Sequence, residues 1–153
     1  MKHSDSAVSE VVGVLLLLTI TLILVSVVAI SMNSAVSTTE KPVSATIIAS
    51  GISGKNITFE NIAGDAFVLD QIEVRLGIRE YPSQYTTLRG SSSLKSYTGS
   101  TTISLGDRFY IQSDEDSPLT WGSFNISSGS HLTYRFYDLR TSSPISSGEI
   151  AIP

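Results

Sequence analysis

The residues able to support catalysis are few and lie far apart in the sequence. Nucleophilic catalysis needs a base within hydrogen-bond reach of a nucleophile, and the chain holds two histidines, His3 and His131, and no cysteine. His3 precedes a long apolar segment, and His131 opens an alternating segment typical of a strand. No glycine-rich loop links a strand to a helix in the manner of phosphate-binding sites. The sequence therefore favours a protein that is not an enzyme and that has no cofactor.

Three consecutive carboxylates, Asp114 to Asp116, are the strongest candidate for metal ligands. Oxygen ligands of this type suit a hard cation such as calcium. The segment lacks the alternating acidic residues, the central glycine and the distal glutamate of a calcium-binding loop. We interpret it as a solvated acidic turn and keep calcium binding as the alternative.

Two triplets match the acceptor pattern for N-linked glycans, and they begin at Asn56 and Asn125. Such triplets also arise by chance in a chain rich in serine and threonine. They carry meaning if the body lies outside a cell that glycosylates its surface proteins. We therefore predict Asn56 and Asn125 as candidate glycosylation sites.

The charge pattern argues against nucleic acid as a partner. The formal net charge is -4 at pH 7, and lysines and arginines are scattered singly rather than gathered in a basic stripe. With no cysteine, an extracellular body would be held by its core, its sheet hydrogen bonds or its neighbours instead of disulfides. The chain is about one domain long.

An uncharged apolar run extends from Val11 to Ile30, interrupted only by small or hydroxyl residues. At ~1.5 Å per residue, a helix of this length crosses a hydrocarbon core of ~30 Å. A cleavable secretory signal is one alternative, but its apolar region is shorter, and only Ala29-Ile-Ser31 offers a small-x-small site here. A permanent anchor with Lys2 and His3 on the cytoplasmic side is another.

The remainder of the chain shows the two-residue alternation of half-buried antiparallel strands. About seven short strands separated by turn residues predict a two-sheet sandwich. Residues 79–100 lack this pattern and predict a long loop or ragged edge strands. Trp121 is expected to pack in the core or at a sheet edge, or else against a neighbouring molecule. The predicted strands are 44–50, 56–61, 72–78, 101–105, 108–112, 131–138 and 148–152.

The segment DSAVSEVVGVLLLLTITLILVSVVAI resembles the N-terminus of archaeal type IV pilins. The family pattern is a charged residue, a small residue, then Val-Ser-Pro-Val-Ile-Gly-Val and an apolar helix. Glu10 stands where the family has proline, and Val12 where isoleucine is common. The body, including ITFENIAGDAFVLDQIEV and LGDRFYI, is similar to the β-domains that follow such segments. The archaellin pattern Gly-Ile-Gly-Thr-Leu is absent. The matching residues are Ala7, Val8, Ser9, Val11, Gly13 and Val14.

The resemblance implies three parts of the chain. Residues 1–7 would be a class III signal peptide, removed on the cytoplasmic side by a prepilin peptidase. Residues 8–41 would form a helix that spans the membrane before assembly and lies in the filament core afterwards. Residues 42–153 would form an immunoglobulin-like antiparallel β-sandwich head. Cleavage between Ala7 and Val8 is preferred, and cleavage between Ser6 and Ala7, which places Asp5 at the usual charged position, is the alternative.

The function implied by the resemblance is that of a structural subunit. Copies would associate through their helices into a helical homopolymer, driven by an assembly ATPase and its membrane platform, with Gly13 allowing close helix approach. The precursor would lie in the cell membrane and the product would be an extracellular filament, with adhesion to surfaces or cells as its role. An archaellum-type motility filament, and a permanently anchored β-sandwich that binds a ligand, are the alternatives.

Glu10 has two interpretations. In the first, it lies in the first turn of the helix, where the macrodipole favours an acid by ~0.3–1 kcal/mol. In the second, processing creates an α-amine two or three residues before Glu10, and the carboxylate pairs with that amine in its own chain or a neighbour's. Bacterial type IV pilins use a glutamate in this way, whereas the proline of the archaeal pattern cannot pair.

Overall fold

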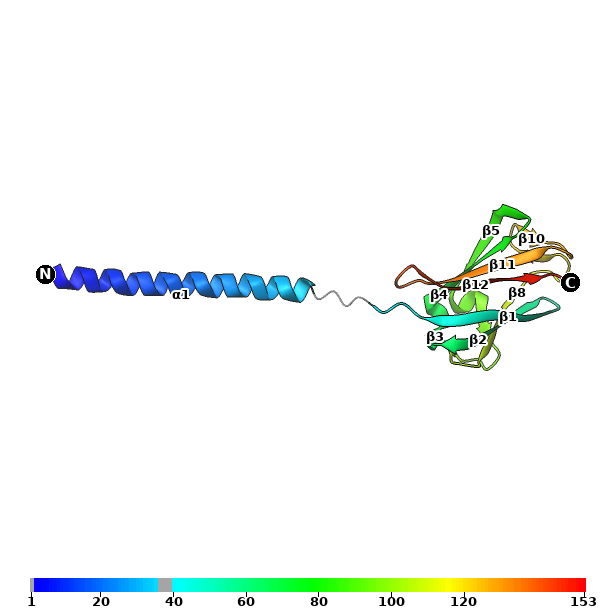
Figure 1. Ribbon diagram of the computed structural model, residues 1–153, viewed down its shortest axis with the longest axis horizontal. Helices are drawn as coiled ribbons and strands as arrows, with labels where there is room; N and C mark the ends of the chain where they lie inside the picture. Colours follow the sequence, from blue (N-terminus) through cyan, green and yellow to red (C-terminus); the bar gives the residue numbers. More distant parts are fainter. Residues whose placement is uncertain (1, 36–39) are drawn as a thin grey trace. The chain divides into compact units, whose positions relative to one another are not determined.

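The computed structural model describes residues 2–35 and 40–153, with side chains described for 5–32 and 40–153. The chain divides into two compact units, residues 1–39 and 40–153. The first contains α1 (Lys2–Ala35), the long helix in Figure 1. Met1 of the predicted leader and residues 36–39 of the predicted helix lie outside the described residues, and residues 40–44 have no regular secondary structure. The predicted domain limits at 7, 41 and 42 stay predictions.

The second unit, called the head below, is a sandwich of two four-stranded antiparallel sheets. The first sheet has the order β1-β2-β8-β6 and the second has the order β12-β11-β4-β5. These are the A-B-E-D and G-F-C-C′ orders of an immunoglobulin-like sandwich, so the predicted fold class is confirmed. The strands are β1 (Ala45–Ser53), β2 (Asn56–Gly64), β4 (Ile72–Ile78), β5 (Tyr81–Arg89), β6 (Leu94–Ser96), β8 (Arg108–Gln112), β11 (His131–Asp138) and β12 (Ser143–Ala151).

Shorter elements complete the head. Two small two-stranded sheets pair β3 (Phe67–Val68) with β7 (Thr102–Ile103) and β9 (Leu119–Trp121) with β10 (Phe124–Ile126). A single 3-10 turn, η1 (Leu69–Gln71), precedes β4, and a short helix, α2 (Gly90–Ser93), precedes β6.

The core between the two sheets is aromatic at its centre. Phe59 of β2 contacts Phe109 of β8 in the same sheet and Tyr134 and Phe136 of β11 in the other, with ring centroids 5.1–5.6 Å apart. The pair with Phe109 is stacked and the other two are edge-to-face, and both arrangements stabilise beyond the area they bury. Trp121 is buried as expected, and its indole nitrogen donates to the carbonyl of Gln112 at 3.0 Å.

Side chains join the two sheets along the edge where β1 and β12 run side by side, cyan and red in Figure 1. The hydroxyl of Ser146 accepts from the backbone N–H of Ile47 at 3.1 Å and donates to the carbonyl of the same residue at 3.0 Å. Nearby, the N–H of Ala49 donates to the Tyr134 hydroxyl at 3.0 Å. The sheet edges are therefore bridged by hydrogen bonds, which blunts two edges that would otherwise be open to foreign strands.

The irregular segment 79–100 is composed of edge elements. β5 is an edge strand of one sheet and β6 is an edge strand of the other, and α2 joins them. Of the two predictions for this segment, edge strands are confirmed and a long loop is wrong. Alternation is weak in β5 because five residues at its start, beginning with Tyr81, are all exposed. The strand predicted at 101–105 is reduced to the two residues of β7.

Candidate functional site

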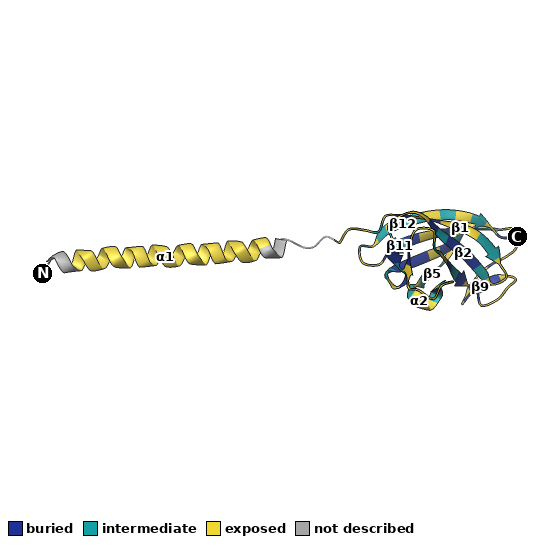
Figure 2. Cartoon of the chain, turned by 90° about the horizontal axis from the view of Figure 1, so that it is seen from below, coloured by how far each residue is buried: buried dark blue, intermediate teal, exposed yellow. Residues whose placement is uncertain are grey.

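The surface of α1 is apolar on all sides. Its large side chains, from Val8 to Met32, are each exposed within the described structure, and the part of the helix coloured by burial in Figure 2 is exposed throughout. A segment from Asp5–Met32 is long and apolar enough to cross a membrane by length and composition. A soluble helix buries one apolar stripe and exposes polar residues elsewhere. The composition of this helix therefore suits lipid or other apolar helices on every side.

The hydroxyl residues within α1 are compatible with that surrounding. Thr19, Thr21 and Ser26 each donate to a backbone carbonyl three or four residues earlier, at 2.7–2.8 Å. A hydroxyl bonded within its own helix exposes no unpaired donor to lipid, so these residues do not prevent membrane insertion. Gly13 has no atom within 4 Å of the place where a Cβ would lie. Nothing in the described part of the chain requires glycine there, and its predicted role in helix approach stays a prediction.

The predicted processing and assembly residues lie on one continuous stretch of helix. Ser6, Ala7, Val8 and Glu10 are all exposed. Because α1 begins at Lys2, the acid in the first turn of the unprocessed helix is Asp5, not Glu10. The macrodipole effect falls off within one turn, so the first interpretation of Glu10 is wrong for the full-length chain. Removal of residues 1–7 would place Glu10 third in the new chain.

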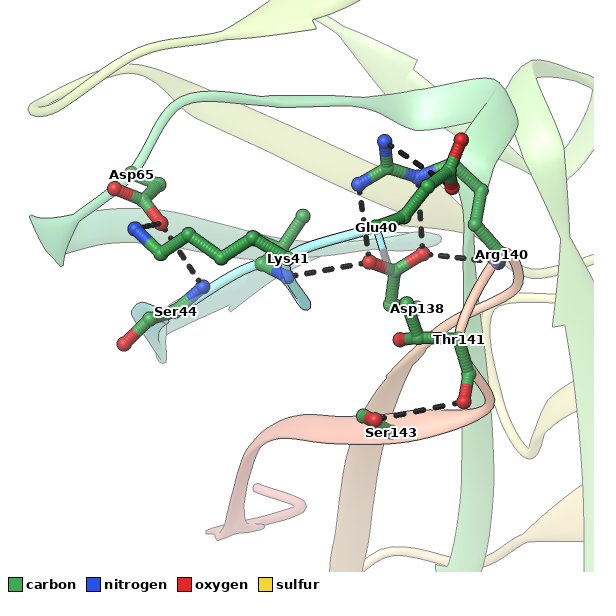
Figure 3. A network of polar contacts seen from close by, with 9 residues as sticks. Glu40, Lys41, Ser44, Asp65, Asp138, Arg140, Thr141 and Ser143 are labelled. Carbon is green, nitrogen blue, oxygen red and sulfur yellow. Dashed lines mark hydrogen bonds and ion pairs between the residues drawn. The ribbon is translucent and has the colours of Figure 1, made fainter. Parts of the chain in front are cut away.

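The start of the head is fastened by five charged residues that we call the junction network: Glu40, Lys41, Asp65, Asp138 and Arg140 (Figure 3). Asp138 is fully buried at the end of β11. It accepts hydrogen bonds from the backbone N–H of Val43 at 3.2 Å and from the Arg140 guanidinium at 3.1 and 3.3 Å. Arg140 also faces Glu40 at 3.8 Å.

Asp65 holds the other side of the same segment. Its carboxylate accepts from the Lys41 ammonium at 3.3 Å and from the Ser44 backbone N–H at 3.2 Å. The N–H of Asp65 donates in turn to the Ser44 carbonyl at 2.8 Å. Residues 40–44 are thus bonded to the β2–β3 loop on one side and to the β11–β12 turn on the other, before β1 begins.

The contacts of the junction network lower the pKa values of its two aspartates, Asp138 and Asp65. Burial pushes the pKa of Asp138 upward and is the largest single influence, but the hydrogen bonds from Arg140 and Val43 and the guanidinium charge together lower it. The pKa of Asp65 is lowered, chiefly by the Ser44 N–H and then by Lys41. Asp138 and Asp65 are therefore charged at neutral pH, and the network acts as a structural clamp rather than as an acid or base.

Gly64 is required where β2 leaves the junction. Its φ is +95°, and a Cβ at this position would lie 2.1 Å from the Ser44 carbonyl oxygen. Only glycine combines that conformation with so close an approach of two backbones. The glycine therefore lets the β2–β3 loop lie directly against residue 44.

The remaining predicted sites lie elsewhere on the head. In the described residues, no group of three or more His, Cys, Asp or Glu side chains could hold a metal, so Asp114 to Asp116 give no support to calcium binding. His131 is bonded through Nδ1 to Glu80 at 2.8 Å, an interaction that lowers the pKa of Glu80. Asn125 is exposed on β10, while the Oδ1 atom of Asn56 is buried without a partner. Glycosylation at both asparagines stays a prediction.

Comparison with known families identifies the N-terminal part of the chain. Residues 6–52 match the family described as "Archaeal Type IV pilin, N-terminal". Residues 6–52 thus match an archaeal type IV pilin N-terminal segment, and we call them the pilin segment. This pilin segment contains most of α1, residues 40–44 and nearly all of β1. The resemblance stated from the sequence is confirmed over these residues.

Two solved structures are similar to the chain. One is an archaellum periplasmic stator protein, FlaG, from Sulfolobus acidocaldarius, with a TM-score of 0.44, 16% identity, and coverage of 71% of this chain and 99% of that chain. The other is the archaellum periplasmic stator protein complex FlaF and FlaG from the same organism, with a TM-score of 0.45, 14% identity, and coverage of 74% and 94%. A search of curated proteins found no significant match.

Sequence reasoning missed the junction network. Of its five members, Asp65, Asp138 and Arg140 lie outside the pilin segment, and no local motif connects them. The one local signal is Glu40-Lys41-Pro42, which indicates the end of a helix and gives no sign of distant partners. The contact between Val43 and Asp138 joins residues 95 positions apart, so only the fold brings the network together.

Proposed function

We propose that this chain is a structural subunit of an archaeal type IV pilus-like extracellular filament, assembled through its N-terminal helix. The observation that carries the proposal is the pilin segment at residues 6–52, which contains a helix that is apolar around its whole circumference. The proposed role is adhesion to surfaces or to other cells. The head is proposed to be structural rather than catalytic.

The helix supports this proposal through its physical requirements. In the membrane, lipid surrounds the apolar side chains, and in a filament the helices of other copies would surround them instead. This exchange moves one apolar surface between two apolar environments, so hydrophobic transfer does not drive it. Close packing of helices, contacts between heads and an assembly ATPase on a membrane platform are the proposed driving forces.

Processing is proposed to prepare the helix for assembly. We propose cleavage by a prepilin peptidase between Ala7 and Val8, with the bond between Ser6 and Ala7 as the alternative. Cleavage creates a positively charged amine close to Glu10. A carboxylate paired with that amine would be neutralised among apolar helices, whereas breaking such a buried pair costs about 3–5 kcal/mol.

The role of Glu10 is tested by comparing Glu10→Gln with Asp5→Asn. Both changes neutralise one acid of α1, but Asp5 belongs to the proposed leader and is absent from the mature chain. We expect Glu10→Gln to be processed normally and to be lost from filaments, while Asp5→Asn still polymerises. Normal filaments from Glu10→Gln would refute the pairing.

The proposal as a whole is tested by mechanical shearing of cells that express the chain. Recovery of the chain in sheared filaments that are visible by electron microscopy is the expected result. Complete retention in the membrane fraction would instead favour a permanently anchored β-sandwich that binds a ligand. Filaments that rotate and drive swimming, rather than attach cells, would identify an archaellum-type subunit.

A further inference from the structure

Two arginines of the head have no ion pair within the described chain. Arg79, Arg89, Arg108 and Arg140 each pair with a carboxylate. Arg75 and Arg135 do not, although both are exposed.

These two arginines lie opposite each other on the outward face of one sheet. Arg75 of β4 is the direct cross-strand partner of Arg135 of β11. Like charges at opposed positions destabilise a sheet. Among the described residues, no carboxylate forms an ion pair with either arginine. The arrangement is therefore costly to the isolated head, and an anionic partner would remove that cost.

Tyrosines hold the arginines in place. The Arg75 guanidinium lies 5.4 Å from the ring centroids of both Tyr85 and Tyr137, and Arg135 donates to the Tyr137 hydroxyl at 3.5 Å. Stacking on aromatic rings restricts a guanidinium and presents its planar donors in a fixed direction. A planar acceptor such as a carboxylate matches these donors.

The arginines line a groove of about 530 Å³ on this face. Its other lining residues include Gly77 and Thr133, whose short side chains leave the centre of the face open. Glu149 is the acid of the groove, and Arg79 already pairs with it at 3.3 Å. The groove thus carries two uncompensated positive charges. We call this surface, defined by Arg75, Arg135, Tyr85 and Tyr137, the arginine face.

Three acids of the head that make no ion pair in the described structure lie together in one loop. Asp114, Glu115 and Asp116 are consecutive and exposed, and none makes an ion pair in the described structure. The buried side chain of Ser113 fixes the conformation of this loop. Its hydroxyl accepts hydrogen bonds from the backbone N–H groups of Glu115 at 3.2 Å and Thr120 at 2.6 Å.

Two further contacts limit the freedom of this acidic loop. Asp114 accepts from the backbone N–H of Gly122 at 3.0 Å. Lys55 donates to the backbone carbonyl of Asp114 at 2.5 Å and leaves the three carboxylates without an ion pair. The loop is therefore a preformed cluster of carboxylates at one end of the head.

We propose that the arginine face of one copy binds the acidic loop, residues 114–116, of a second copy. The two arginines of the face and the three carboxylates of the loop then find opposite charges without any other protein. The two surfaces are different, so each copy can bind one neighbour through its loop and another through its face. A head-to-tail contact of this kind extends without closing on itself. The proposal rests on the proposed function, because polymerisation is what brings the heads together.

The contact is tested by cysteine cross-linking. The natural chain has no cysteine, so the introduced cysteines are its only thiols. Ser147 is the cross-strand partner of Arg135 on β12, and Ser117 directly follows the acidic loop; both are exposed. Full-length Ser147→Cys and Ser117→Cys chains are co-expressed, and intact cells are treated with a short bis-maleimide. We expect a cross-linked dimer when both are present. A matched control replaces Ser117→Cys with Ser104→Cys, at another exposed serine, and we expect no dimer from it.

Charge reversal tests the chemistry of the contact. We call the cross-link between the Ser147→Cys and Ser117→Cys chains the 147–117 cross-link. Arg135→Glu is expected to lower its yield about tenfold, and Glu115→Arg added to Arg135→Glu is expected to restore the yield. Lys95→Glu, at an exposed lysine on the other sheet, is the matched control and should leave the yield unchanged. A yield that is insensitive to Arg135→Glu would overturn the proposal.

The outcomes separate this inference from the proposed function. Filaments that form from processed chains without a 147–117 cross-link would overturn the inference and leave the proposed function standing. A 147–117 cross-link in unprocessed, membrane-bound chains would support the inference and contradict the proposed function. A cross-link between two Ser147→Cys chains would indicate a symmetric contact and would also overturn the inference.

Discussion

Asp138 is predicted to contribute more stability than any other single carboxylate of the head, because it is fully buried and fastens residue 43 to the sandwich. One of its oxygens accepts from the backbone and side chain of Arg140, and the other accepts from the Val43 N–H and from Arg140. In Asp138→Asn, an NH2 group replaces one of these oxygens, and this group faces hydrogen-bond donors only. The perturbation therefore removes a charge and leaves buried donors without an acceptor.

The expected loss is about 2–4 kcal/mol of unfolding free energy. Hydrogen bonds to a charged group contribute about 1.5–3 kcal/mol, and an unsatisfied buried donor costs about 1–3 kcal/mol. Arg140 is partly exposed, with 33% of its side chain accessible, so water compensates part of the lost ion pair. Asp107→Asn is the matched control: Asp107 accepts one backbone hydrogen bond and makes no ion pair in the described chain, so its loss should stay below about 1 kcal/mol.

The assay is urea unfolding of the full-length chain in detergent, followed by the fluorescence of Trp121, the single tryptophan. The pKa of Asp138 is lowered in the folded head. Its stabilising contribution is therefore fully present above the unfolded pKa of about 3.9 and is lost as the pH falls through the lower folded value. The difference between wild type and Asp138→Asn should shrink steadily below about pH 4. Equal stability at pH 7, or a difference that persists unchanged in acid, would refute this reasoning.

Two further predictions concern backbone contacts. Gly64→Ala should destabilise the head by more than about 2 kcal/mol, because its φ of +95° and the Ser44 oxygen at 2.1 Å leave no room for a methyl group; urea unfolding measures the loss, and wild-type stability would contradict it. Ser146→Ala should cost about 1–3 kcal/mol, because both bonds to Ile47 are lost where β1 meets β12; exposed Ser147→Ala is the control, and equal behaviour of the two variants would disprove the role of the bridge.

Strands with one buried face could be predicted from the sequence. β4, β8 and β11 alternate apolar and polar residues, and their predicted limits agree with the structure. β5 could not be predicted, because an edge strand exposed along its first half has no reason to alternate, and Pro82 normally argues against a strand interior. β9 and β10 have three residues each, too few for a period to emerge.

The features of the candidate site also divide into those that the sequence predicts and those that depend on the fold. The apolar helix and its resemblance to pilins are local properties, so the sequence alone predicts them. The junction network and the arginine face depend on pairs far apart in the chain, such as Arg75 with Arg135, which only the strand register brings together. An isolated charged residue in the sequence does not indicate whether the fold will place an opposite charge beside it.

The central claim, that the chain becomes a filament subunit when its leader is removed, is tested most directly by determining the N-terminus of sheared extracellular material. Mass spectrometry of the N-terminal peptide is expected to find a chain that begins at Val8, or at Ala7 if the alternative bond is cut. An intact Met1 in that material would contradict the account.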